Sequence, residues 1–269
     1  MIAMRNLTIG QFYNVDSVIH RLDPRVKIVF AFVFVLTLFF DKNPMLFIMA
    51  LAILALYIGL SKVPLRFILR GTKMLAFIIV LTGMMNLITV KGAKVIFEWQ
   101  FVRITEAGVS AAVYTTLRLI LMIIGSSMMT YTTTPKDLTE GLEKMLGWMK
   151  KLGIPVHEFA MIMSIALRFV PVIVEELDKI MKAQMARGID FNEGNLLVRL
   201  RKLIPILIPL IVSAMKRSHE LALAMDARCY HGGEGRTKMK PLAYRRRDYI
   251  AYGMVLMYFV GMILLAIYF

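Results

Sequence analysis

The sequence has 269 residues, of which 58% are hydrophobic, and a net charge of +15 at pH 7; its mean hydropathy is +0.67. Soluble domains contain about 45–50% apolar residues. The apolar residues here form long blocks, which excludes an ordinary soluble domain and indicates lipid-facing surface. The positive charge fits the excess of Lys and Arg on the cytoplasmic side of membrane proteins and contact with anionic lipid, and no nucleic-acid-binding motif accompanies it.

Five apolar segments predict five transmembrane helices, because a spanning helix needs about 20 mainly apolar residues. The segments are Ile28–Phe40, Met45–Leu60, Leu75–Val90, Ala107–Tyr131 and Tyr249–Phe269. A short outer turn at 41–44 joins the first two. We expect three regions: 1–131 with an N-terminal segment and four spans, 132–248 as a cytoplasmic region, and 249–269 as the last span.

Basic residues predict the orientation of these spans in the cell membrane. They precede the first span, fill the 61–73 loop without an acidic residue, and precede the last span as Arg245, Arg246 and Arg247. The 91–106 loop fits less well, since it also carries basic residues. We expect the N-terminus and region 132–248 to be cytoplasmic and the C-terminus to be outside.

Region 132–248 predicts three further helices, so the expected fold class is an all-α integral membrane protein. Thr134 and Pro135 suit a helix start, and Gly153 with Pro155 suits its end after Lys151. The second helix is expected over Val156–Arg187 and the third over Leu196–Arg228. Both contain apolar stretches that are short for a span, and whether residues 156–215 enter the bilayer stays open.

The second and third of these helices end alike. One ends in Ala186-Arg187-Gly188 and the other in Ala227-Arg228-Cys229. An unobstructed guanidinium can bind a carboxylate of a partner through two hydrogen bonds. An arginine at a helix C-terminus also stabilises its own helix, which explains either end alone. The repetition favours contact with a partner.

Three motifs resemble the transmembrane component of energy-coupling factor (ECF) transporters, the EcfT/CbiQ-type family. They are Leu22-Asp23-Pro24-Arg25-Val26-Lys27, the segment from Ala166 through Pro171 to Gly188, and the segment from Arg217 to Arg228. The resemblance covers essentially the whole chain. Cys229 departs from the Gly or Ser that is commoner after the second arginine, and its small size predicts no loss of function.

The resemblance implies a scaffold without catalysis of its own. Such components hold a small membrane protein that binds a vitamin or metal ion (the S component) against two ABC-type ATPase subunits. The three helices of 132–248 would be coupling helices. Ala186, Arg187 and Gly188, and likewise Ala227, Arg228 and Cys229, would dock in grooves of the two ATPases.

Two further groups of residues have candidate roles. Asp23, Pro24 and Arg25 are either a cytoplasmic latch or a helix cap with a positive-inside charge. Arg168 with Pro171 is a possible hinge, because proline loosens a helix.

Catalysis, metal binding and nucleotide binding find no support in the residues. The single cysteine, Cys229, excludes an intrachain disulfide, and His157-Glu158 is not followed by a second histidine at position 161. No GxxxxGK[ST] phosphate loop occurs. We therefore predict no cofactor and no metal, and ATP binding in another subunit. A membrane enzyme would need clustered polar groups. A self-sufficient channel or secondary carrier remains the alternative, although the spans contain one arginine, Arg118, and no paired acids.

Overall fold

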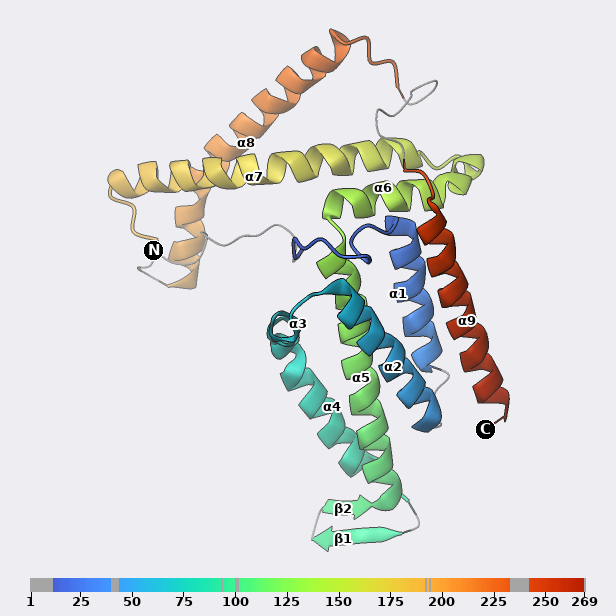
Figure 1. Ribbon diagram of the computed structural model, residues 1–269. Helices are drawn as coiled ribbons and strands as arrows, with labels where there is room; N and C mark the ends of the chain where they lie inside the picture. Colours follow the sequence, from blue (N-terminus) through green and yellow to red (C-terminus); the bar gives the residue numbers. More distant parts are fainter. Residues whose placement is uncertain are drawn as a thin grey trace. The chain divides into compact units, whose positions relative to one another are not determined.

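The computed structural model describes residues 12–39, 44–92, 94–99, 102–191, 193, 195–232 and 242–268 (Figure 1). The predicted all-α class is confirmed, with one short hairpin added to the helices. The chain divides into two compact units. The first unit is Met1–Gly141 with Leu242–Phe269, and the second is Leu142–Pro241.

The first unit holds the apolar helices. They are α1 (Pro24–Phe39), α2 (Pro44–Ser61), α3 (Leu65–Thr72), η2 (Lys73–Leu75), α4 (Ala76–Thr89), α5 (Glu106–Thr132) and α9 (Arg246–Tyr268). Helix α1 packs against α2, α5 and α9. Its Phe34 is fully buried and stacks with Tyr258 of α9. Gly125 of α5 lies against the same ring, since a Cβ added there would be 2.5 Å from Phe34 Cε1.

Three helices of the described residues, α2, α5 and α9, are long and apolar enough to cross a membrane. Helices α3 and α4 meet at 65° and would add a fourth crossing if they form one span. Helix α1, the first predicted span, has 16 residues, and the predicted turn after it includes residues 40–43, which lie outside the described residues. Large apolar side chains such as Phe32, Ile48 and Met257 are exposed on these helices, as lipid contact requires.

Two segments that were expected to be loops have regular structure. In the 61–73 loop, α3 forms an amphipathic helix that buries Ile68. In the 91–106 loop, β1 (Val95–Trp99) and β2 (Val102–Thr105) pair as an antiparallel hairpin, with Val95 opposite Thr105 and Trp99 opposite Val102. The sequences VIFEW and VRIT are rich in β-branched and aromatic residues, which favour a strand over a helix.

Helix α6 (Pro135–Met145) begins where the sequence predicted. The backbone N–H of Asp137 donates to Thr134 Oγ1 at 3.2 Å, and the Thr134 hydroxyl donates to Asp137 Oδ2 at 2.8 Å. The predicted continuation of this helix to Lys151 is a 3₁₀ helix instead, η3 (Leu146–Leu152). Gly153 follows it with φ +80°. Glycine suits this left-handed position because it has no Cβ.

The second unit is dominated by two long helices, α7 (Val156–Ala186) and α8 (Leu196–Asp226), within two residues of the expected bounds. They pack antiparallel: Gln184 contacts Pro205, and Glu176 contacts Ser213 and Arg217. Helix α8 changes direction along its length in Figure 1, and it contains Pro205 and Pro209, which are common causes of such a bend.

One hydrogen bond between these helices follows directly from the prolines. Proline at position 209 has no backbone N–H, so the carbonyl of Pro205 loses its partner within the helix. Gln184, which is buried, donates its Nε2 to that carbonyl at 3.2 Å. The side chain of α7 thus satisfies an acceptor that the sequence of α8 leaves open.

Candidate functional site

The C-terminal end of α7 presents Arg187. The chain turns at Gly188, where φ is +89°, and the Gly188 N–H donates to Met185 O at 3.0 Å. The N–H of Ile189 returns to Gln184 O at 3.1 Å. This pair of bonds satisfies carbonyls of the last helical turn. The side chain of Arg187, the residue before this turn, is exposed.

The C-terminal end of α8 repeats this geometry around Arg228. Cys229 has φ +57°, and its N–H donates to Asp226 O at 2.9 Å. The N–H of Tyr230 returns to Met225 O at 3.1 Å. A residue with a Cβ pays about 1–2 kcal/mol in this left-handed conformation. The backbone at position 229 therefore has a positive φ. The sequence pattern indicated only that the side chain is small.

The guanidinium groups of Arg187 and Arg228 have no carboxylate partner among the residues that the structure describes. Arg217, by contrast, is bound to Glu176 at 3.0 Å. Because α7 and α8 are antiparallel, the two free arginines lie at opposite ends of the helix pair. Arg228 is about 35 Å of helix beyond the point where Pro205 meets the end of α7.

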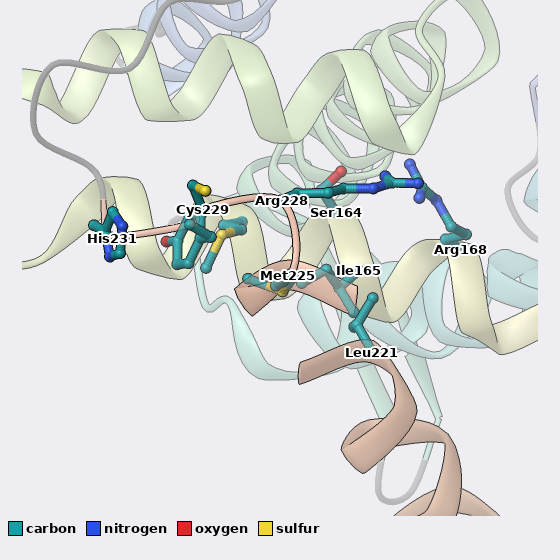
Figure 2. A pocket seen from close by; sticks show the side chains of 11 residues that line it. Ser164, Ile165, Arg168, Leu221, Met225, Arg228, Cys229 and His231 are labelled. Carbon is teal, nitrogen blue, oxygen red and sulfur yellow. The ribbon is translucent and has the colours of Figure 1, made fainter. Parts of the chain in front are cut away.

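Arg168 and Pro171, the possible hinge, lie inside α7, which remains helical on both sides of Pro171. Arg168 lines a cavity of about 600 Å³ together with Arg228. In Figure 2 the two side chains point toward one another. Residues 168 and 228 are far apart in the chain, and only the antiparallel packing of α7 and α8 brings them together.

Asp23, Pro24 and Arg25 lie in the first unit, where α1 begins. The Asp23 carboxylate accepts from Arg25 Nη2 at 2.8 Å, and both side chains are largely buried. The guanidinium of Arg25 lies 3.7 Å from the ring centroid of Tyr244. Asp248 of α9 accepts from the Asp23 backbone N–H at 2.9 Å. The three residues thus start a helix and also join the N-terminal segment to the start of α9.

Next to this network is a buried lysine that sequence reasoning missed. Lys27 Nζ donates to Thr132 O at 2.7 Å and to His20 O at 3.3 Å. Thr132 ends α5, where helix carbonyls lack partners within the helix. Burial lowers the pKa of His20, and its Nε2 donates to Tyr13 O at 2.9 Å. In the sequence, Lys27 is one of the basic residues before the first span and the last residue of the first family motif, and neither pattern predicts its burial.

The apolar helices of membrane-spanning length define the class of this chain as an integral membrane protein. The family model described as cobalt transport protein (CbiQ) matches residues 16–239, so the chain belongs to this family and is a membrane component of a transporter.

Relatives of similar length carry a more detailed name. A protein of Ruminiclostridium cellulolyticum, named energy-coupling factor transporter transmembrane protein EcfT, is 42% identical over 262 residues, which are 97% of this chain and 98% of the relative. Proteins with the same name from Thermosediminibacter oceani and Bacillus subtilis are 46% and 41% identical, over 93% and 91% of this chain and 94% and 92% of their own lengths. The resemblance to ECF transmembrane components is thereby confirmed.

Proposed function

We propose that this chain is the coupling subunit of an ECF-type ABC importer. It transmits the ATP-driven motion of two ATPase subunits to a separate membrane protein that binds a vitamin or a metal ion. It contributes no catalytic residue and no cofactor, and the partner subunits hydrolyse ATP. The names of its relatives support its membership of such a transporter.

The repeated arginine-bearing helix end is the observation that carries this proposal. Arg187 and Arg228 follow the same cap geometry, are exposed and lack a carboxylate partner within the described residues. Because the two arginines lie at opposite ends of the antiparallel helix pair, each can bind a different ATPase subunit. Each guanidinium can bind an acidic side chain of its subunit through two hydrogen bonds.

The contacts between α7 and α8 support a mechanical role. Gln184 holds Pro205, and Glu176 accepts hydrogen bonds from Ser213 and Arg217. The hydrogen bonds from Ser213 and Arg217 also lower the pKa of Glu176, because both favour its ionised carboxylate. A pair held at several points along its length moves as one body, so that displacement of an arginine end is carried along both helices.

The proposed topology follows from the charges. The second unit and the N-terminus are cytoplasmic, in line with the basic residues before α1, in α3 and before α9. The C-terminus is outside. The ATPases therefore meet the helix ends from the cytoplasm.

A double charge reversal tests the proposal in the complete transporter. Arg187→Glu with Arg228→Glu places a carboxylate opposite each acidic groove, so ATP-driven uptake into proteoliposomes is expected to fall by more than about tenfold. The matched control is Lys179→Glu with Lys216→Glu, which makes the same charge change on exposed positions inside the same two helices. It should retain uptake.

Membrane insertion of both variants is checked by extraction and size-exclusion chromatography. Full uptake by the arginine variant would refute the coupling role of the two ends. Substrate transport by the purified chain alone in liposomes would instead support the channel or carrier alternative.

A further inference from the structure

Helices α7 and α8 each turn one face toward a shared cavity of about 600 Å³. On α7 this face carries Ile165 and Arg168, three positions apart, and on α8 it carries Leu221 and Met225, four positions apart, spacings that place each pair on one side of its helix. Arg228 lies two residues beyond the end of α8, in the turn that closes this helix, and also lines the cavity. Figure 2 shows the apolar side chains between the helices and the two arginines extending past them.

The two guanidinium groups form an unusual arrangement. In Figure 2 they point toward one another, although both are always positively charged. Neither has a carboxylate partner in the part of the chain that the structure describes. Two like charges directed at the same space repel, and an anion between them converts this repulsion into attraction.

We propose that Arg168 and Arg228 together bind one carboxylate group of an ATPase subunit. This inference rests on the proposed function and extends it, because it assigns a docking role to a residue of the middle of α7. A carboxylate has two oxygens with about four acceptor sites, enough for hydrogen bonds from two guanidinium groups. Arg168 is thus a partner-binding residue at the α8 end.

An acidic residue of a polypeptide fits this site better than a small ion or a lipid phosphate. Besides the arginines, the apolar side chains of Met161, Ile165, Leu221 and Met225 line the cavity, together with Ser164, Cys229, Tyr230, His231 and Gly232. Methionine and leucine side chains provide adaptable apolar surface for side chains that flank an acidic residue. A protein partner satisfies the charged and the apolar parts of the cavity at the same time.

The two ends of the helix pair are then unequal. Arg168 is about 28 Å of helix away from Arg187, so it cannot assist the α7 end. The α8 end binds its ATPase with two arginines and the α7 end with one. Binding at the α8 end should therefore fall more steeply with salt.

A double-mutant cycle tests whether Arg168 and Arg228 share one ligand. In the complete complex reconstituted in nanodiscs, the Kd for the ATPase subunits is measured for Arg168→Gln alone and in Arg228→Gln and Arg187→Gln backgrounds. We expect Arg168→Gln to raise Kd by about tenfold, as loss of one hydrogen bond to a charged group does. In the Arg228→Gln background its effect should shrink to within about twofold, whereas in the Arg187→Gln background it should stay about tenfold, because only groups that share a partner are coupled.

Controls separate this inference from the proposed function. Arg201→Gln removes an exposed arginine of α8 outside the cavity and should leave Kd unchanged. Helical content and retention of the substrate-binding protein show that each variant is folded. If Arg187→Gln and Arg228→Gln raise Kd but Arg168→Gln does not, or acts equally in every background, the shared site is refuted and the proposed function survives. If none of the three raises Kd, both fail.

A comparison of two lipid compositions tests whether a lipid phosphate occupies the site instead. An effect of Arg168→Gln that occurs in phosphatidylglycerol nanodiscs and vanishes in phosphatidylcholine nanodiscs would assign the site to a lipid phosphate and overturn the proposal. The same effect in both lipids supports a carboxylate of the protein partner.

Discussion

In the second unit, a side chain of α7 supplies a hydrogen bond that the backbone of α8 lacks. Gln184 is polar and buried, which is costly unless its amide is hydrogen-bonded. Its partner is the Pro205 carbonyl that Pro209 leaves free. Position 229 has a left-handed backbone conformation, which favours glycine, yet the residue there is Cys229. Both features arise from backbone geometry that side-chain chemistry alone does not reveal.

Replacing Gln184 should therefore destabilise the α7–α8 pair. Gln184→Leu keeps the volume but leaves the Pro205 carbonyl without its donor, which costs about 1–3 kcal/mol. Hydrogen exchange of the α8 amides, measured by mass spectrometry on the chain in detergent, should show faster opening.

Pro209→Ala provides the matched background for this measurement. It restores the backbone N–H that can bond the Pro205 carbonyl within α8. The cost of Gln184→Leu should then fall well below its value in the natural chain. An equal cost in both backgrounds would show that the glutamine stabilises the pair in some other way.

At the scale of elements, close contacts between helices decide how the first unit packs. Helix α1 is short but central, and its buried Phe34 fits against Gly125 of α5 and the ring of Tyr258. Lys27 at the start of α1 ties this helix to the end of α5 through the Thr132 carbonyl. Contacts at the start and in the middle of α1 explain why a helix of modest length is so well buried.

Gly125→Ala should disrupt the contact between α1 and α5. The added Cβ would be 2.5 Å from the Phe34 ring, and such overpacking costs about 1–3 kcal/mol. Thermal unfolding in detergent should show a lower Tm. Gly253→Ala in α9 is the control, because nothing lies within 4 Å of an added Cβ there.

A second change identifies the clash as the cause. Phe34→Leu removes ring atoms from the contact, so Gly125→Ala should cost less in that background than in the natural chain. A Tm for Gly125→Ala equal to that of Gly253→Ala would contradict the tight packing at this point.

At the scale of the whole molecule, the chain combines a unit of apolar helices with a unit of two long helices, whose C-terminal ends are followed by the exposed Arg187 and Arg228. Its single cysteine, Cys229, is exposed beside one of these arginines and reports on that end without any mutation. We expect a membrane-impermeant maleimide to label Cys229 in inside-out vesicles and not in intact cells, when the chain is expressed without ATPases. Labelling from outside would reverse the proposed topology.

Adding the ATPase subunits extends this measurement to the docking proposal. Their binding at the α8 end should protect Cys229 from the maleimide. Cys229→Ser serves as the unlabelled control. Labelling at an unchanged rate with the ATPases bound would place their docking site elsewhere.

The sequence by itself determined the membrane class, the long helices and the two Ala-Arg ends, because each depends on local composition or on helical periodicity. It missed α3 and the hairpin β1–β2, because elements of eight, five and four residues contain too few periods to stand out beside the long apolar helices. Only the tertiary structure decided which distant residues meet. The antiparallel packing of α7 and α8 brings Arg168 to Arg228 and Gln184 to Pro205, and no spacing along the chain encodes such contacts.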